Sequence, residues 1–149
     1  FFFFKYIIMA KAARIQRVRY RFQYAVKFIC TSNIPGTSQT TDAFLPGVYQ
    51  TAVNIHNPQT KKIKMRKKIA SPIGISKYFD GGLDPDAVER ITCGQIRDFG
   101  LTFIHGFEGF LVIESTDSLD VVAVYTAGGR GEQVASIDVE QIKERKLGR

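Results

Sequence analysis

The chain has 149 residues, the size of one ordinary domain, which leaves no room for two sizeable hydrophobic cores. Hydrophobic residues make up 44% of it and charged residues 23%, a balance that excludes wholesale disorder. No apolar run approaches the roughly 18 to 20 residues of a membrane-spanning helix, and the formal net charge is +7.

The positive charge is concentrated at the beginning of the chain. Residues 1–41 contain seven lysines and arginines and no acidic residue, whereas the other 14 basic residues are matched by all 14 acidic ones. From Asp42 onward the chain is therefore formally neutral. We interpret the chain as a basic, apolar N-terminal arm over residues 1–22 followed by one domain over residues 23–149.

The arm opens with aromatic and aliphatic residues that a protein does not leave in water without a use. Burial against a partner subunit, interfacial anchoring in lipid and the remnant of a signal segment all fit this run. Because the chain begins with phenylalanine, we expect processing, truncation or a start at Met9. The residues expected to dock onto a partner are Phe1, Phe2, Phe3, Phe4, Tyr6, Ile7, Ile8, Arg14, Arg17 and Arg21.

Two conformations fit the end of the arm. Arg14, Arg17 and Arg21 recur at helical spacing, which predicts a short amphipathic helix over residues 10–21. Residues 18–24 alternate between apolar and polar, which predicts the beginning of the first strand instead.

The rest of the chain has the period of β-strands and is rich in β-branched and aromatic residues. Turn residues separate these runs every 8 to 15 positions, which favours an antiparallel β-sandwich over βαβ units. A brief helical turn is predicted over residues 93–99. The seven expected strands cover residues 24–31, 47–56, 61–70, 88–92, 109–115, 120–126 and 134–142.

The turns and the alternation predict how these strands connect and face. Residues 57–60 and 128–131 indicate hairpins, residues 80–86 a wider loop, and Asp117 and Asp120 a further hairpin. The positions expected to face the core are Tyr49, Thr51, Val53 and Ile55, or their alternates, together with Phe110, Val112, Val122 and Val124.

The two cysteines, Cys30 and Cys93, allow two interpretations. A disulfide would close a loop of about 60 residues, worth roughly 3 to 4.5 kcal/mol, and would require an oxidising compartment. Two buried free thiols in the cytosol are the alternative. No Cys-x-x-Cys or histidine-rich spacing accompanies them, so we expect no metal site and no zinc.

No group of residues has the pattern of a catalytic site. His56 and His105 lie beside turns without a supported nucleophile, and we expect them to satisfy hydrogen bonds. Asp80, Asp84, Asp86 and Glu89 lack the order of a calcium loop and are read as solvated turn residues. We therefore expect no cofactor and no enzymatic activity.

A second basic run consists of Lys61, Lys62, Lys64, Arg66, Lys67 and Lys68. Such a charged face protects an edge strand from aggregation. The functional alternative is a surface that binds an acidic glycan or a lipid headgroup.

Five segments of this chain resemble segments of a known group of proteins: 26–30, 46–58, 109–115, 119–127 and 136–140. Together they resemble small secreted bacterial proteins of uncharacterised function, over residues 24–145. The resemblance implies an immunoglobulin-like sandwich, a location outside the cytoplasm, periplasmic or at the cell surface, and a Cys30–Cys93 disulfide. The chain departs from this group at its start, where the Phe-rich stretch replaces the expected signal segment.

The leading hypothesis is a non-catalytic structural or accessory subunit that docks through its arm onto a membrane-associated or filamentous assembly. Its partners would be other protein subunits or copies of itself, with contact to a membrane surface through the arm as a further option. A binding module for an acidic glycan or lipid headgroup is the second hypothesis. Nucleic-acid binding, with Tyr6, Tyr20, Phe22 and Tyr24 stacking on bases, ranks third.

Overall fold

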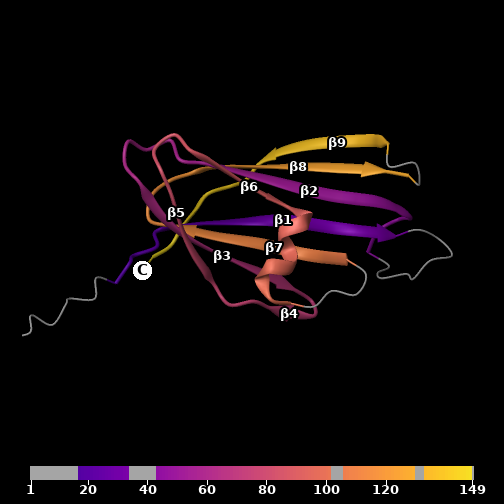
Figure 1. The fold of residues 1–149 in the computed structure, drawn as a ribbon, viewed down its shortest axis with the longest axis horizontal. Coiled ribbons are helices and arrows are strands. Elements are labelled where there is room, and N and C mark those ends of the chain that lie inside the picture. Colours follow the sequence, from indigo (N-terminus) through magenta and orange to yellow (C-terminus); the bar gives the residue numbers. More distant parts are fainter. Residues whose placement is uncertain (1–16, 34–42, 102–105, 130–132, 149) are drawn as a thin grey trace, which may run out of the picture.

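The computed structural model of the protein describes residues 17–33, 43–101, 106–129 and 133–148. This part of the chain is an all-β fold with one short 3-10 helix, η1 (Cys93–Phe99) (Figure 1). The strands are β1 (Phe22–Asn33), β2 (Gly47–His56), β3 (Ile63–Ser71), β4 (Gly74–Ile75), β5 (Phe79–Leu83), β6 (Val88–Thr92), β7 (Gly106–Ser115), β8 (Asp120–Gly128), β9 (Val134–Gln141) and β10 (Arg145–Lys146). All seven expected strands are present, β2 and β6 with the expected bounds.

The strands form two groups, and all the pairs among the described residues are antiparallel. In the first group, β7 lies between β1 and β3, and β3 pairs with β4 and β5 on its other side. In the second group, β2 lies between β6 and β8, and β8 pairs with β9. Strand pairing connects the two groups through three residue pairs, between the end of β1 and the beginning of β2.

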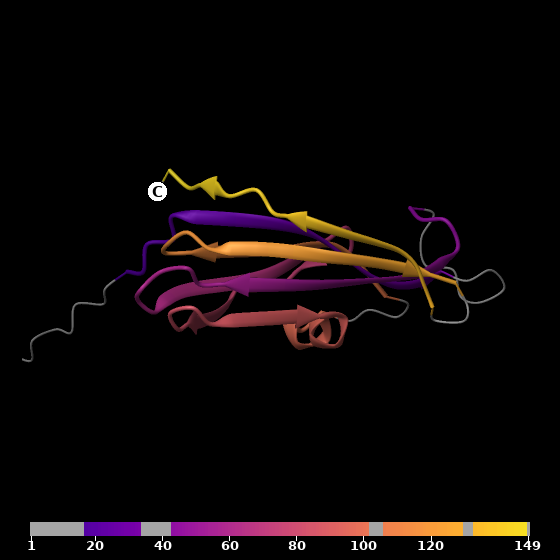
Figure 2. The same cartoon turned by 90° about the horizontal axis from the view of Figure 1, so that it is seen from above.

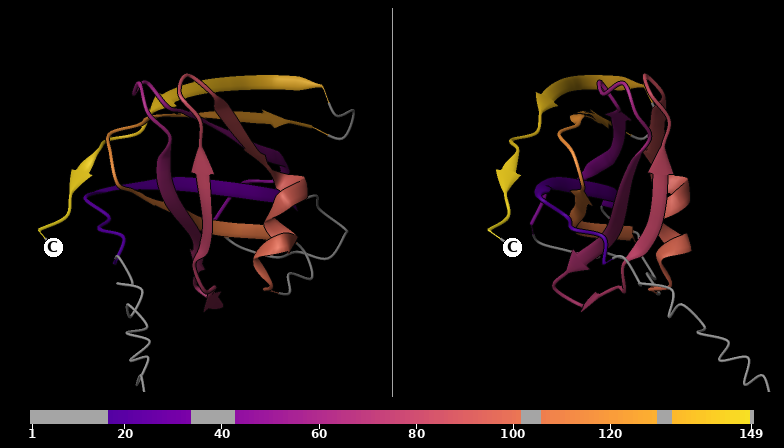
Figure 3. Two further views of the ribbon diagram at one scale, coloured as in Figure 1. Left: turned by 60° about the vertical axis from the view of Figure 1, so that its left-hand side comes forward. Right: turned by 90° about the vertical axis from the view of Figure 1, so that its left-hand side faces the viewer.

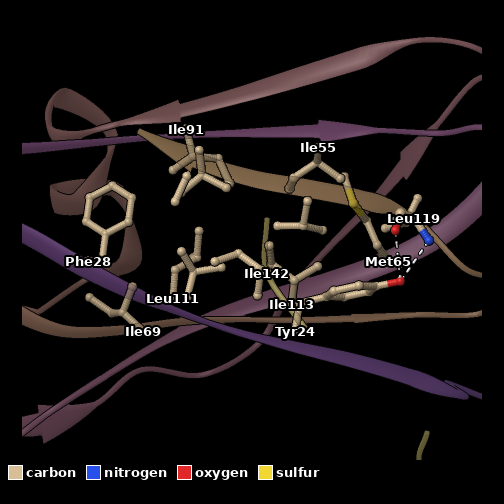
Figure 4. Packing of buried hydrophobic residues seen from close by; sticks show 14 of the residues in the cluster. Tyr24, Phe28, Ile55, Met65, Ile69, Ile91, Leu111, Ile113, Leu119 and Ile142 are labelled. Atoms are coloured by element: carbon tan, nitrogen blue, oxygen red, sulfur yellow. Dashed lines mark hydrogen bonds between the residues drawn. The ribbon is translucent and has the colours of Figure 1, made fainter. Parts of the chain in front are cut away.

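The two groups share one hydrophobic core (Figure 4). In β2, Thr51, Val53 and Ile55 are buried, which confirms the first of the two predicted alternations. They meet side chains from β1, β3 and β7, so neither group of strands has a core of its own. The fully buried large side chains include Tyr24, Val26, Phe28, Val53, Ile55, Ile63, Met65, Ile69, Leu111, Ile113 and Val121.

The predicted inward positions of β7 and β8 are wrong by one residue. Leu111 and Ile113 are buried in β7, and Val121 and Ala123 in β8, whereas Phe110 is 44% exposed. Both alternating sets are apolar in these strands, as in Phe110-Leu111-Val112-Ile113, so the period of two leaves the phase undetermined. The neighbouring strands decide it through their register.

Two predicted hairpins are also wrong. The 57–60 turn leads from β2 to β3, and residues 116–119 lead from β7 to β8, yet neither pair of strands is adjacent in the sheet. Both connections cross from one group of strands to the other. Asn57 fixes the first crossing because its buried side-chain amide donates hydrogen bonds to the carbonyls of Lys61, Leu83 and Asp84, at 2.9, 2.9 and 3.1 Å. The hairpin predicted at residues 128–131 joins β8 and β9, which do pair.

The glycines at positions 81 and 82 lie in a strand, β5, and not in the predicted wide loop. β5 pairs with β3 from Leu83 to Phe79, so the backbone groups that face β3 are satisfied although the glycines contribute no side chains. Leu83 is buried and Phe79 packs against the core. Glycine is a turn signal in the sequence, but here its flanking apolar residues decide the conformation.

Neither prediction for the end of the arm is met in full. Residues 17–21 have no regular secondary structure, and β1 begins at Phe22, four residues after the start of the alternation. The rest of the predicted helix, residues 10–16, lies outside the described residues.

The C-terminal segment closes one end of the fold by crossing from β8 to β1 (Figure 2). Ile142 is buried and its amide donates to the carbonyl of Val121 at 2.9 Å. The Tyr24 hydroxyl accepts from the Leu119 amide at 2.7 Å and lies 2.6 Å from Glu144 Oε1. Burial, followed by the hydrogen bond to Glu144, raises the pKa of Tyr24 to about 12, so this anchor stays protonated at neutral pH.

The predicted disulfide is confirmed. Cys30 of β1 is bonded to Cys93 at the start of η1, with the two Cα atoms 5.6 Å apart. Since β1 and the β6–η1 segment belong to different groups of strands, the bond links the two groups covalently. It does so across 63 residues of sequence.

Reduction of this disulfide should lower the free energy of unfolding by about 4 kcal/mol, because a cross-link over a long loop restricts the unfolded chain. Urea unfolding with and without a phosphine reductant measures the loss. The Cys30→Ser/Cys93→Ser double variant is the control, and its midpoint should not respond to reductant. Equal midpoints for oxidised and reduced protein would contradict the prediction.

Candidate functional site

The predicted docking residues lie mostly outside the described residues, which include Arg17 and Arg21 but not Phe1–Phe4, Tyr6, Ile7, Ile8 or Arg14. Both arginines are exposed. The Arg21 amide donates to the Ser115 carbonyl at 2.9 Å, and its carbonyl accepts from the Leu147 amide at 2.7 Å. The base of the arm is therefore held between β7 and the C-terminal segment.

The second basic run is divided between different environments. Lys64, Arg66 and Lys68 alternate with the buried Ile63, Met65 and Ile69 and so face away from the core. Lys67 has the opposite orientation, with its Nζ 2.6 Å from Glu89 Oε1. Lys61 pairs with Asp117 at 3.3 Å, whereas Lys62 is exposed.

Arg66 is committed to a buried carboxylate. Its Nε and Nη2 donate to Oε1 of the fully buried Glu114 at 2.8 and 2.5 Å, and Gln23 donates to Oε2 at 3.0 Å. The guanidinium also lies over the rings of Tyr78 and Tyr20, at 4.0 and 4.3 Å from their centroids. A charge so enclosed is a structural element and is not available to an anionic ligand.

This pair belongs to a row of polar residues that crosses five strands. In register, Asp80, Arg66, Glu114, Gln23 and Arg145 are successive partners from β5 to β10. Cross-strand partners share one face of a sheet, so the row lies on the side opposite the core. The row holds the first group of strands together from outside.

The four acidic residues considered for calcium do not converge. Glu89 pairs with Lys67, Asp80 accepts a hydrogen bond from Tyr20 at 3.4 Å, and Asp86 pairs with His56. No group of three or more potential metal ligands occurs within the described ranges. His105 lies outside these ranges.

His56 bridges two acidic residues at the end of β2. Its Nδ1 lies 2.7 Å from Asp120 Oδ2 and its Nε2 lies 2.7 Å from Asp86 Oδ1. The hydrogen bond to Asp120 and then that to Asp86 raise the pKa of His56 above its usual value. This geometry connects β2 with β8 and with the turn before β6, which matches the expected structural role.

The pattern of β9 is the reverse of that of a core strand. Ile137 and Val139 pair with Thr126 and Val124, on the face turned away from the core, whereas Asp138 and Glu140 pair with Tyr125 and the buried Ala123. All eight residues of β9 are exposed, and Val134, Ile137 and Val139 each retain more than 60% of their surface. The strand therefore presents its apolar side to solvent.

β9 also has an unpaired edge. Within the part of the chain that the structure covers, it pairs with β8 alone and lies at the margin of the sheet (Figure 3). A groove of about 310 Å³, lined by Gln50, Ala52, Thr92, Val124 and Thr126 among others, lies on the same outer face. We call the edge of β9 together with Ile137, Val139 and Val124 the β9 surface. The sequence predicted the strand, and Ser-Ile-Asp-Val-Glu alternates between polar and apolar residues. It did not predict that the apolar residues would be exposed.

Replacing Arg66 by methionine should destabilise the protein by about 3 kcal/mol, because it leaves the Glu114 carboxylate buried without a cation. Adding Glu114→Leu should recover part of the loss. Urea unfolding measures both, and Lys64→Met, an exposed position on the same face of β3, should change stability little. A larger loss in the double variant than in Arg66→Met would contradict this account.

The contribution of His56 should depend on pH. Because its folded-state pKa is raised, the stabilisation is fully present below about pH 6.5 and is lost as the pH rises through the folded-state value. The difference in urea midpoint between the wild type and His56→Gln should therefore be larger at pH 6 than at pH 9. A difference that is constant or grows with pH would refute the assignment.

None of the helices in the described ranges is long and apolar enough to cross a membrane. No family model matches the chain, and no curated protein matches it. Among solved structures, it is similar to a Thermotoga maritima protein whose crystal structure is described by the number 1070 alone. The two share 10% identity with a TM-score of 0.55, over 83% of this chain and 93% of the other. At this identity the likeness concerns the fold, and it supports an all-β architecture.

Proposed function

We propose that this protein is a non-catalytic structural subunit of an assembly outside the cytoplasm, in which the N-terminal arm of one copy packs on the β9 surface of the next. The observation that carries the proposal is the reversed pattern of β9. Exposed apolar side chains on a strand with an unpaired edge favour aggregation unless a partner covers them.

A partner in extended conformation suits this surface. The unpaired edge offers main-chain donors and acceptors for one further strand, and Ile137 and Val139 offer apolar contacts beside it. Asp138 and Glu140 make the strand acidic, which disfavours nucleic acid and anionic lipid.

The arm has the complementary composition. Residues 1–16 contain the Phe-rich run and three basic residues, Lys5, Lys11 and Arg14, with no acidic residue. Apolar side chains can cover Ile137 and Val139, while the basic ones face Asp138 and Glu140. Because arm and β9 surface are different parts of the molecule, their contact is head-to-tail and can continue into a filament or close into a ring.

The disulfide supports the proposed compartment. Disulfides persist in oxidising environments and are rare in the cytosol, so the Cys30–Cys93 bond supports a periplasmic or cell-surface location. The resemblance of residues 24–145 to small secreted bacterial proteins points the same way.

We also infer that the two groups of strands form a sandwich of the immunoglobulin-like kind. A common core and a disulfide between the groups support this inference. The likeness lies in the layered architecture, since the strand orders β5-β3-β7-β1 and β6-β2-β8-β9 differ from those of immunoglobulin domains.

Replacing Ile137 and Val139 by lysine should weaken self-association at least about tenfold, because two apolar contacts are lost and positive charge meets the basic arm. Sedimentation velocity over a range of concentrations measures this. Ile73→Lys is the matched control, since Ile73 is 73% exposed in the turn between β3 and β4, and it should associate like the wild type.

A chain that begins at Arg17 retains all described contacts and should fail to associate. Self-association that survives this truncation, or that ignores the lysine substitutions, would refute the proposal. So would a wild type that stays monomeric and binds vesicles of anionic lipid, which would assign the arm to a membrane surface.

A further inference from the structure

A cavity separate from the β9 surface lies where β3, β5, β6 and η1 meet. Its volume is about 240 Å³. Phe79, Ile91 and Phe99 form its apolar wall, with the rings of Phe79 and Phe99 packed edge to face at 5.3 Å between centroids. This position is set by the fold, because Ile91 and Phe99 belong to the core and η1 is fixed through the Cys93 disulfide.

One residue that lines this cavity has a carboxylate oxygen without a hydrogen bond. Glu89 Oε1 accepts from Lys67 Nζ at 2.6 Å, but Glu89 Oε2 is buried and has no hydrogen bond. It is the one buried side-chain nitrogen or oxygen atom among the described residues for which this holds. A buried carboxylate oxygen without a donor is costly, and a rotation of the Glu89 carboxylate toward the cavity would bring Oε2 within reach of a donor there.

The other polar groups of the cavity offer both donors and acceptors. Lys67 keeps two N–H donors beyond the one used by Glu89. Gln95 uses its side-chain oxygen to accept from the Thr92 amide at 2.7 Å, which leaves its two amide donors. Asp98 adds an exposed carboxylate at the rim.

The charges around the cavity balance. Lys67 and Glu89 form an ion pair, Asp98 adds one negative charge, and Lys77 adds one positive charge with its Nζ 5.2 Å from the Phe79 ring centroid. Neither a cation nor an anion gains from net attraction here. The matching ligand is uncharged, carries hydroxyl groups that both donate and accept, and has an apolar face.

We propose that this cavity binds a neutral hexopyranose ring, as a free sugar or as the terminal residue of a glycan. A ring hydroxyl donates to the Glu89 carboxylate once it has turned toward the cavity. Neighbouring hydroxyl oxygens accept from Lys67 and Gln95, and the C–H face of the ring packs against the aromatic wall. Cavities for drug-sized ligands begin near 300 Å³. This cavity is somewhat smaller, so its volume suits a single sugar ring. This inference is independent of the proposed assembly.

The test is a titration of the isotopically labelled full chain with the methyl glycosides of glucose, galactose and mannose. Shifts of the Ile91 methyl and Gln95 side-chain amide resonances should saturate with at least one of them. Glu89→Gln should weaken that binding about tenfold or more, since a hydrogen bond to a charged group is lost. Glu108→Gln, which alters a lysine-paired glutamate outside the cavity, is the matched control and should bind normally.

Asp98→Asn serves as the second variant because Asp98 is exposed and its replacement does not endanger folding. It should weaken binding several-fold with an unchanged melting temperature. The proposal is overturned if no glycoside produces saturable shifts, if butylguanidinium binds in their place, or if both cavity variants bind like the wild type.

Discussion

The fold depends on a hydrophobic core that two groups of strands must share. The main chain joins these groups through three residue pairs between β1 and β2, and neither group buries its apolar side chains alone. Core contacts from β1, β2, β3, β7 and β8 therefore supply most of the attraction between the groups. The Cys30–Cys93 bond at one end and the Tyr24 anchor at the other restrict how the groups can separate.

The shared core also explains where the two candidate surfaces lie. β9 extends past the margin of the core, so its residues are exposed on both faces and its apolar side is free to point outward. The cavity lies at the opposite side of the second group, where η1 covers the space between β3 and β6 without filling it.

The sequence predicted the strands well because alternation and turn residues are local signals. It predicted β2 and β6 with their bounds, and it weighed the disulfide against free thiols on the spacing of two cysteines. It failed where the orientation or the connection of a strand depends on segments far away in the sequence. The phase of β7 could not be derived because Phe110-Leu111-Val112-Ile113 is apolar on both faces, and the crossing after His56 looked like a hairpin because its turn residues are the same.

The candidate sites were less accessible to prediction than the fold. The basic run on β3 is a single block in the sequence, but Arg66 is taken up by a glutamate 48 positions away and Lys67 by one 22 positions away. Likewise, the vacant hydrogen-bonding position of Glu89 arises from the packing of three elements and leaves no local signal. The arm was singled out from its composition, whereas its proposed receptor on β9 emerged from the register with β8.

In the proposed assembly, the arm of one copy covers β9 of another. Hydrogen–deuterium exchange of the full chain at low and high protein concentration tests it most directly, since it reports on the β9 amides themselves. Exchange of Val134–Gln141 should slow at high concentration, while that of β4 and β5 should stay the same. Exchange in β9 that is rapid at every concentration would contradict it.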